Sequence, residues 1–274
     1  MADPTTELSA EPSGEEATDT DTLDDDTPND PAAAGPQDDT RPSGNHIRDL
    51  KAIGRGPSAA YWMVAGDCIE NYESTAQQAH INDLSMTEMI RVHRRIKFEG
   101  LDRLAGRFGR VVAATCGSNH GRVRRGREAV GPPSDNSGIE VLSQIADAYA
   151  RNEDAYGHVS FVMPEQWRKS VSLDIAGKIV GLAHGHQYAR PDKADDWWRA
   201  QSFGRQPIAD ADILITGHFH HFRAQQLGHG RLHIQAPTLD SGSDWYTARS
   251  GEVSHQGLLT CSVSAYGWDD LRIL

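Results

Sequence analysis

The stretch DILITGHFHH (residues 212–221) joins a short run of apolar residues to a cluster of three histidines. A continuous apolar run of this length is typical of a strand buried on both faces, as in the parallel sheets of α/β proteins. Polar residues that follow such a strand lie at the carboxyl end of the sheet, where open α/β sheets bind ligands. The stretch therefore predicts a buried strand that delivers histidines to a site.

Three other stretches have the same arrangement. YWMVAGD (61–67) ends in an aspartate, VVAATCG (111–117) is followed by Ser-Asn-His, and KIVGLAHGH (178–186) ends in His-Gly-His. Because ligand-binding residues gather at the carboxyl ends of the strands in such sheets, we expect the polar residues after all four strands to converge. These residues are Asp67, Asn119, His120, His184, His186, His218, His220 and His221.

Helical patterns accompany these strands. Ser85-x-x-Glu88 is a capping box that predicts the start of a helix, and GIEVLSQIADAYA (138–150) has the apolar spacing of an amphipathic helix. A further helix is expected around residues 194–203. In the first helix we expect one apolar side, formed by Met89, Val92, Ile96, Leu101 and Leu104, and one basic side, formed by Arg91, Arg94, Arg95, Lys97, Arg103 and Arg107.

Strands dominate the second half of the chain. VSLDIAG (171–177) is expected to pair with the strand that precedes His184, and the strands RLHIQAP (231–237), GLLTCSVS (257–264) and DLRIL (270–274) follow at short spacing. Alternating strands and helices, followed by a run of strands, indicate sheets that pack face to face under a cover of helices. The predicted fold class is α/β, a layered β-sandwich flanked by helices.

The converging side chains make a metal-ligand set. Imidazole nitrogens, a carboxylate and an amide oxygen suit Zn, Mn or Fe, and they are poor ligands for Ca or for copper bound through thiolates. An aspartate has two oxygens and can bridge two cations. Two cations about 3.5–4 Å apart clamp a phosphoryl group and generate hydroxide at neutral pH. The sequence therefore predicts divalent metal ions as cofactors.

The order of these blocks resembles the calcineurin-like metallophosphoesterase superfamily, whose blocks run D-x-H, G-D-x-x-(D/E), G-N-H, a lone H and G-H-x-H. Gly66-Asp67-Cys68-Ile69-Glu70 matches the second block, and Ser118-Asn119-His120 matches the third with Ser118 in place of the family's Gly. His184 matches the fourth block, and Gly217-His218-Phe219-His220 matches the fifth. The resemblance spans roughly residues 61–250 and implies an αββα fold.

The resemblance also implies roles for these residues. The ligands of two divalent metal ions are Asp67, Asn119, His184, His218 and His220, and His120 protonates the leaving oxygen or steadies the transition state. The implied activity is metal-dependent hydrolysis of a phosphodiester or phosphomonoester. Arg122, two residues after His120, is a candidate to hold a phosphate. With the basic helix it allows a polyanionic substrate such as nucleic acid, so a nuclease is one candidate.

One block of the family is missing. No D-x-H occurs upstream of residue 61, although by resemblance this block supplies two ligands to one metal and the central first strand of a sheet. Three explanations stay open: a chain without its upstream residues, a variant with one metal, and a degenerate site. We favour the first, because the loss of a core strand is hard to reconcile with a chain that is otherwise intact, and the neighbouring strand would expose an edge.

Two further functions are open to such a sequence. A degenerate site would make the chain a non-catalytic protein that binds a metal ion or a phosphate. A metallo-β-lactamase-like hydrolase would need H-x-H-x-D-H, and Phe222 stands where that motif has its aspartate. The sequence therefore favours the phosphoesterase, with the non-catalytic binding protein as the alternative.

The charge of the chain is concentrated in its first forty residues. They contain nine Asp, four Glu and no Lys or Arg, which gives them a charge of −13 against −12 for the whole chain. Such a segment buries too little apolar surface to offset the entropy lost on ordering it. We expect residues 1–58 to be a disordered acidic tail and linker, and residues 59–274 to be a metallophosphoesterase-like domain.

The cysteines and the apolar runs indicate a cellular location. Cys68, Cys116 and Cys261 are far apart and show no C-x-x-C spacing, which argues against a disulfide framework and fits a reducing cytosol. The sequence shows no signal peptide and no apolar run long enough to cross a membrane. We expect a cytoplasmic protein. Its expected partner is a phosphate-ester substrate, nucleic acid included. The sequence does not predict an oligomeric state.

Overall fold

The structure is a computed structural model, and the residues it describes form one compact unit within Arg41–Leu274. They are residues 47–48, 50–72, 80, 82–126, 128–239, 251 and 256–274. The predicted disordered tail falls mostly outside these ranges, so the tail and the domain boundary stay predictions. Among the described helices, none combines the length and the apolar character that a membrane span requires.

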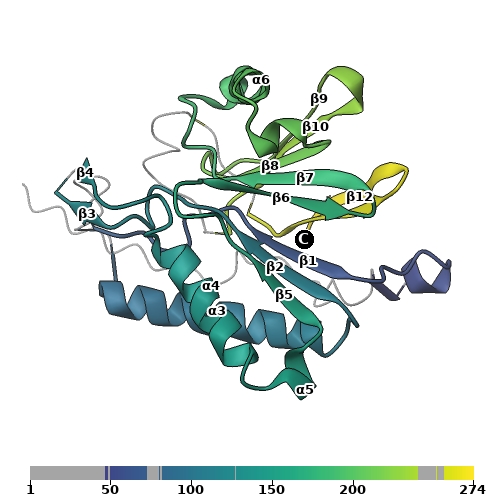
Figure 1. Cartoon of the computed structure of the whole chain (residues 1–274), viewed down its shortest axis with the longest axis horizontal. Coiled ribbons are helices and arrows are strands. Elements are labelled where there is room, and N and C mark those ends of the chain that lie inside the picture. Colours follow the sequence, from purple (N-terminus) through teal and green to yellow (C-terminus); the bar gives the residue numbers. More distant parts are fainter. Residues whose placement is uncertain are drawn as a thin grey trace, which may run out of the picture. The chain divides into compact units, whose positions relative to one another are not determined.

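The first sheet is parallel and has the strand order β1-β2-β5. β1 (Ala60–Val64) pairs with β2 (Val111–Thr115), and β2 pairs with β5 (Val159–Val162). α3 (Met86–Ala105) and α4 (Ser137–Tyr149) cover one face of this sheet (Figure 1). Each parallel strand is thus reached through a helical crossover, as parallel pairing requires.

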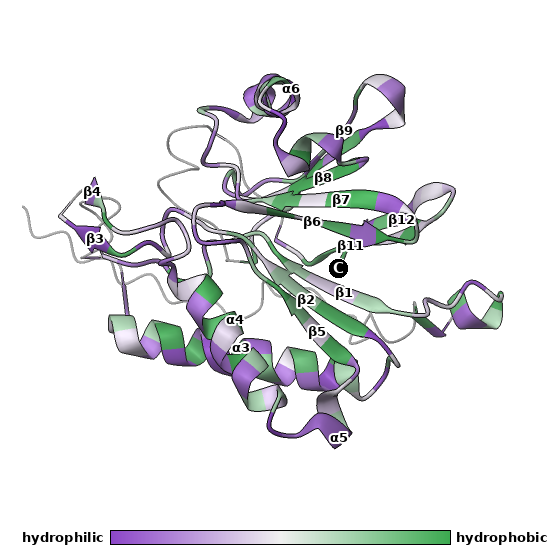
Figure 2. Ribbon diagram, in the orientation of Figure 1, coloured by the Kyte–Doolittle hydropathy of each residue, from purple (hydrophilic) through white to green (hydrophobic). Residues whose placement is uncertain are grey.

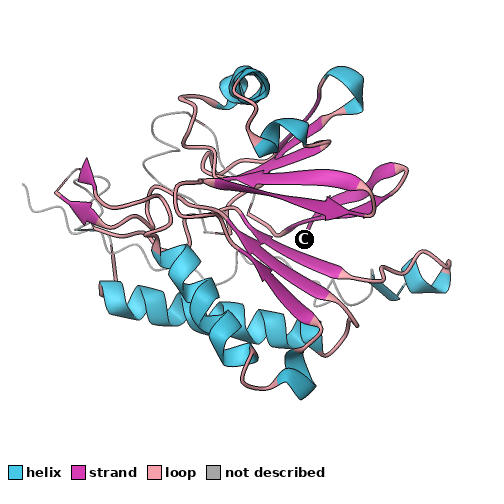
Figure 3. Ribbon diagram, in the orientation of Figure 1, coloured by secondary structure: helices cyan, strands magenta, loops and turns pink. Residues whose placement is uncertain are grey.

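The second sheet is mixed and has the strand order β6-β7-β8-β10-β9. β6 (Ser170–Ile175) and β7 (Lys178–Ala183) form the expected antiparallel hairpin, β8 (Ile213–Thr216) and β10 (Leu232–Gln235) run parallel to β7, and β9 (Arg223–Gln226) is an antiparallel edge strand (Figure 3). The outer face of this sheet is covered by α6, residues Ala194–Phe203.

The two sheets face each other, and their inner faces form the main core. Val112 and Ala114 of β2, followed by Cys116, pack there with buried residues of the second sheet, namely Val171, Leu173, Ile175, Val180, Leu182, Ile213, Leu232 and Ile234. Figure 2 shows apolar strands inside and mixed polar helices outside. The layered β-sandwich flanked by helices is therefore confirmed.

Short elements complete the described part of the chain. The last strands, β11 (Leu259–Ser264) and β12 (Gly267–Ile273), form an antiparallel hairpin of their own. The remaining elements are β3 (Arg124–Arg125), β4 (Glu128–Ala129), α5 (Glu153–Tyr156) and the 3₁₀ turns Pro191–Lys193, Pro207–Asp210 and Gly228–Gly230. The sequence analysis missed β5 and β9, because each has four residues and β9 reads RAQQ without apolar alternation.

α3 begins where the capping box predicted. The Glu88 carboxylate accepts a hydrogen bond from the Ser85 backbone N–H at 2.9 Å. This bond satisfies one of the N–H groups that a helix start leaves unpaired.

The buried side of α3 matches the predicted one at Met89 and Leu101 and differs from it elsewhere. Its buried residues are Met89, His93, Lys97 and Leu101, which follow one another at the i, i+4 spacing of a single helix face. Val92 and Ile96, predicted to be buried, are instead 40% and 61% exposed. The prediction of Lys97 on a basic outer face is therefore wrong, because an apolarity pattern counts lysine as polar and ignores its aliphatic stem.

Candidate metal centre

The loops that follow β1, β7 and β8 bring three predicted ligands together. Asp67, His184 and His218 form a cluster in which the candidate ligand atoms all lie within 4.8 Å of one another. His184 Nε2 is 2.9 Å from Asp67 Oδ2 and 3.2 Å from His218 Nδ1. The side chain of His184 is 1% exposed and that of Asp67 is 13% exposed. His184 and Asp67 are therefore largely shielded from water, whereas the side chain of His218 is 27% exposed.

The loop after β2 adds Asn119 and His120 to this cluster. Asn119 Oδ1 lies 2.9 Å from His184 Nε2, and the His120 backbone N–H donates a hydrogen bond to Asp67 Oδ1 at 3.1 Å. The His120 ring lies between two carboxylates, with Nε2 3.9 Å from Asp67 Oδ2 and Nδ1 3.4 Å from Glu70 Oε2. The backbone of His120 thus orients Asp67 while its ring connects the cluster to Glu70.

The backbone of these loops is strained at three of the predicted ligands. Asp67, His218 and His220 have φ angles of +46°, +72° and +62°, which L-residues adopt rarely and at a cost of order 1–3 kcal/mol each. Gly66, with φ +98°, precedes Asp67, and a Cβ there would lie 2.6 Å from both His184 Nδ1 and the Cβ of Ser118. Only glycine therefore lets this loop approach His184 so closely.

Burial and neighbouring charges shift the pKa values of the ionisable groups in and around the cluster. Burial acts to raise the pKa of Asp67, but contacts with His184 and His218 and the charge of His120 hold it well below its usual range. Burial acts to lower the pKa of His120, but Glu70 and Asp67 outweigh it and raise this pKa. His186 has a pKa of about 3, because it is buried beside other histidines and Lys169. The site thus favours a charged Asp67 and a protonated His120.

His184 has a defined tautomer. Its Nδ1 lies 2.6 Å from the Ala65 carbonyl oxygen, which can only accept a hydrogen bond, so Nδ1 carries a proton. Nε2 is then the nitrogen that this ring can offer to a metal ion. It faces two oxygens, Asn119 Oδ1 and Asp67 Oδ2, at 2.9 Å. Asp67 Oδ2 is buried and has no hydrogen-bond donor within the described residues.

A cation can bind between these atoms, where the Asp67 carboxylate, the Asn119 side chain and two imidazoles converge. Two imidazoles, a carboxylate and an amide oxygen form a donor set that fits Zn, Mn or Fe. The bond from His184 Nδ1–H to the Ala65 carbonyl is the kind of support that orients a metal-binding histidine. The residues present therefore fit one divalent cation held by Asp67, Asn119, His184 and His218.

The remaining predicted site residues lie around this cluster rather than in it. The His220 backbone carbonyl accepts a hydrogen bond from Thr238 N–H, and its ring is outside the three-residue cluster. Arg122 donates hydrogen bonds to the carbonyls of Val130 and Gly131 at 3.2 and 3.0 Å. The roles of His220 as a metal ligand and of Arg122 as a substrate-binding residue stay predictions.

Two side chains outside the predicted set of site residues shape the loop after β2. Asn71, buried and at φ +67°, donates a hydrogen bond from Nδ2 to the His120 carbonyl at 2.7 Å. Arg124 donates one to the Asn119 carbonyl at 3.1 Å. An asparagine four residues after Asp67 was the available signal, since asparagine tolerates positive φ better than most residues.

Comparisons with known proteins find similarity among solved structures only. No protein-family model matches this chain, and no curated protein does. Among solved structures, Vps29 from Entamoeba histolytica complexed with Zn²⁺ is 17% identical, with 62% of this chain and 78% of that chain covered and a TM-score of 0.33.

Two further solved structures match in the same way. Vps29 from Chaetomium thermophilum is 12% identical over 74% of this chain and 84% of that chain, with a TM-score of 0.37. A predicted phosphoesterase from Streptococcus pneumoniae is 10% identical over 74% and 79%, with a TM-score of 0.32.

Proposed function

We propose that this chain is a metal-dependent phosphoesterase that hydrolyses a phosphodiester or a phosphomonoester. One observation carries the proposal: Asp67, His184 and His218 form a cluster in which His184 Nε2 lies 2.9 Å from both Asp67 Oδ2 and Asn119 Oδ1. This cluster lies directly beside His120 and Glu70. A cation site next to a proton donor provides the two components that phosphate-ester hydrolysis uses.

Asp67, Asn119, His184 and His218 would hold one divalent cation, and His220 with Asp67 would contribute to a second. When bound, such cations supply positive charge that stabilises the phosphoryl oxygens in the transition state. The protein contributes a preformed set of ligands, since the Asp67 carboxylate is already oriented by the His120 N–H and His184 by the Ala65 carbonyl.

His120 is the proton donor in this proposal. During hydrolysis the oxygen of water bonds to phosphorus, the bond from phosphorus to the leaving oxygen breaks, and the leaving oxygen takes up a proton. Glu70, 3.4 Å from Nδ1, occupies one side of the His120 ring, which leaves the Nε2 proton for the substrate. Both carboxylates favour the protonated ring that this role requires.

The arginines near His120 favour an anionic substrate. Arg124 contacts the Asn119 carbonyl, and Arg122 belongs to the same loop. Guanidinium groups beside a phosphate-ester site suit phosphodiesters of high charge density. We therefore include single-stranded nucleic acid among the substrates of this proposed phosphoesterase.

The full chain loaded with Mn²⁺ or Zn²⁺ is expected to hydrolyse bis(p-nitrophenyl) phosphate or p-nitrophenyl phosphate. The release of p-nitrophenolate should rise with metal occupancy and stop on addition of EDTA. The Asp67→Asn variant lacks the central carboxylate and should be inactive. Any activity that remains when it is purified in parallel therefore comes from a contaminating hydrolase. If the metal-loaded chain turns over neither ester nor single-stranded nucleic acid, the proposed activity is wrong.

A second candidate is the non-catalytic protein that binds a metal ion or a phosphate. It is favoured by the metal-ligand cluster of the described residues, which contains only Asp67, His184 and His218 as carboxylate or imidazole ligands, and by the missing D-x-H block. This candidate predicts that inorganic phosphate binds to the metal-loaded chain without any turnover. Titration calorimetry with phosphate, combined with the ester assay, separates the two candidates.

A further inference from the structure

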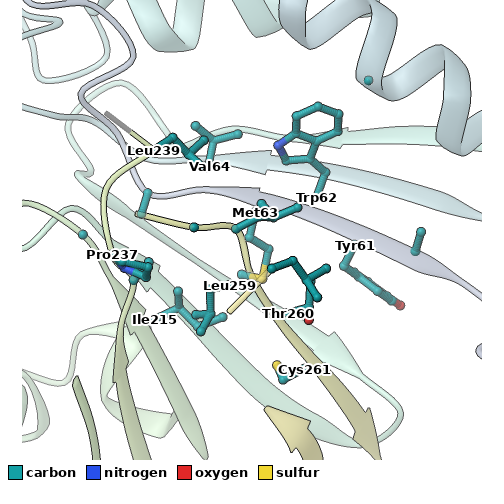
Figure 4. Close-up of a pocket in the computed structure, with 18 of the residues that line it drawn as sticks. Tyr61, Trp62, Met63, Val64, Ile215, Pro237, Leu239, Leu259, Thr260 and Cys261 are labelled. Carbon is teal, nitrogen blue, oxygen red and sulfur yellow. The ribbon is translucent and has the colours of Figure 1, made fainter. Parts of the chain in front are cut away.

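A large groove runs along β1 and reaches the metal centre. Its volume is about 3690 Å³. The residues labelled in Figure 4 line it, and they are Tyr61, Trp62, Met63, Val64, Ile215, Pro237, Leu239, Leu259, Thr260 and Cys261. β1 pairs with β2 alone among the described strands, so the groove is the place that the resemblance assigns to the missing first strand. Its mainly apolar lining suits a strand of the chain's own core, and no ligand site is assigned to it.

A smaller recess, lined by other residues, lies beside an exposed tryptophan. Its volume is about 160 Å³, whereas pockets that enclose a small ligand measure ~300–1,000 Å³. Trp167, which is 73% exposed, lines the recess together with Lys169 and Gln187. A recess of this size takes part of a ligand, and the rest of the ligand would lie along the surface beside Trp167.

The pairing of β6 with β7 brings this recess next to the metal centre. Ser170, the first residue of β6, pairs with Ala183, the last residue of β7. Paired residues in antiparallel strands have Cα atoms ~4.5–5.5 Å apart, and the next residues beyond this pair are Lys169 and the candidate ligand His184. Lys169 therefore leaves the sheet beside His184.

Gln187 connects the recess to the metal centre directly. It lines the recess, and its Oε1 accepts a hydrogen bond from the Gly185 backbone N–H at 2.8 Å. Gly185 follows His184, and a Cβ on Gly185 would lie 3.2 Å from the Cβ of His218. The recess and the candidate ligands are thus joined by the loop that follows β7.

The turn that carries Trp167 is held by hydrogen bonds although the indole is exposed. The Arg168 N–H closes the turn with a hydrogen bond to the Glu165 carbonyl at 2.9 Å. The Ser134 N–H, from the loop after β2, donates a hydrogen bond to the Gln166 carbonyl at 3.2 Å. An aromatic side chain on a turn that is already ordered loses little conformational entropy when it binds a ligand. Trp167 is therefore a preformed aromatic surface next to the metal centre.

Positive charge accompanies this aromatic surface. The Arg168 guanidinium is already occupied, because it donates a hydrogen bond to Gln206 Oε1 at 2.6 Å and lies 3.6 Å from the Glu165 carboxylate. Lys169 is exposed, and within the described residues it forms no ion pair with a carboxylate. Its ammonium group is therefore available to an anionic ligand.

An aromatic face with a cation beside it suits single-stranded nucleic acid. The bases of a single strand stack on aromatic side chains, and its phosphates bind cations. In a duplex the bases stack on one another, so a duplex presents no free base to Trp167. The charged neighbours Glu165, Arg168 and Lys169 do not form the apolar groove that an amphipathic peptide helix needs.

We propose that Trp167 and Lys169 form a nucleotide subsite for single-stranded nucleic acid beside the metal centre. The indole stacks on one base, and the ammonium group contacts a phosphate next to that base. The inference rests on the proposed phosphoesterase function, in which the phosphate to be cleaved lies at Asp67, His184 and His218. The subsite favours an oligonucleotide over a small phosphate ester, because an oligonucleotide reaches both the cation and the indole.

Binding of a fluorescently labelled oligodeoxythymidylate of about twelve nucleotides to the full chain tests the subsite. Anisotropy is measured in EDTA, so that no turnover is needed. Trp167→Ala should weaken binding by about 5- to 150-fold, the loss expected for one stacked base, whereas Trp167→Phe keeps an aromatic face and should retain most of the affinity. Phe203→Ala is the matched control, because Phe203 is 97% exposed on α6, and it should bind as the parent chain does.

The salt dependence of the same binding tests Lys169. Lys169→Met should make the slope of log affinity against log salt concentration shallower by ~0.7, the value for one phosphate contact on a single strand. Lys178→Met is its control, because Lys178 lies at the other end of β7 from His184, and it should keep the parent slope.

Kinetics of the metal-loaded chain connect the subsite to hydrolysis. Trp167→Ala should lower the ratio of kcat/KM for the oligonucleotide to kcat/KM for bis(p-nitrophenyl) phosphate by about the factor that is lost in binding. Binding that depends on Trp167 in a chain that hydrolyses no ester would support the subsite and contradict the proposed activity. The subsite is wrong if the parent chain does not bind the oligonucleotide, if it binds a duplex equally tightly, if Trp167→Ala keeps the parent affinity, or if Phe203→Ala loses as much.

Discussion

Asp67→Asn is expected to lower the affinity of the chain for Zn²⁺ or Mn²⁺ by about 100-fold or more. The amide has the size of the carboxylate and can still accept the hydrogen bond from the His120 N–H, so the loop keeps its shape. It lacks the negative charge that faces His184 and His218, and that charge is what a divalent cation needs in a buried site. Titration calorimetry of the metal-free chain measures the loss.

Asp147→Asn is the matched control for this change. Asp147 lies on α4 and is exposed, so the same substitution there should leave the metal affinity within experimental error. Equal metal affinity in Asp67→Asn and Asp147→Asn would contradict the assignment of Asp67 as the central ligand.

His120→Asn is expected to lower kcat of phosphate-ester hydrolysis by about 10²–10⁴-fold, with metal stoichiometry and KM close to those of the parent. The reason is that the His120 ring contacts Asp67 and Glu70 at 3.9 and 3.4 Å and supplies a proton, whereas the cation would be held by other side chains. Steady-state kinetics and metal analysis of the same preparation give both quantities.

Two further histidine variants separate chemistry from metal binding. His184→Asn should lose metal and activity together, because His184 Nε2 is at the centre of the ligand set. His229→Asn, at an exposed turn, should change neither. Full kcat in His120→Asn, or loss of its metal, would show that His120 is not the proton donor.

The fold was predictable where strong local signals occur. Apolar runs that end in Asp67, Asn119, His184 and His218 gave β1, β2, β7 and β8, because a strand buried on both faces has to be apolar throughout. The edge strand β9 (RAQQ) carries no such signal, since its place is set by backbone pairing with β10. The buried face of α3 was predicted only in part, because Lys97 and His93 are polar in any scale and are buried by the tertiary fold alone.

The site was predictable in its composition and not in its geometry. The residue types after each strand indicated the metal-ligand set, and the structure brings Asp67, Asn119, His184 and His218 within contact of one another. The tautomer of His184 follows from a backbone carbonyl, that of Ala65, which carries no sequence signal. Positive φ angles at non-glycine residues such as His218 likewise depend on the packing around the loop.

The X-ray absorption spectrum of the Zn²⁺-loaded full chain tests the central claim, that Asp67, Asn119, His184 and His218 bind a divalent cation. We predict nitrogen and oxygen neighbours at ~2.0–2.1 Å, outer scattering from two imidazoles, and no sulfur at ~2.3 Å although Cys68 follows Asp67 in the chain. A thiolate sulfur in the first coordination sphere, or a zinc ion surrounded by water oxygens without imidazole scattering, would contradict the account.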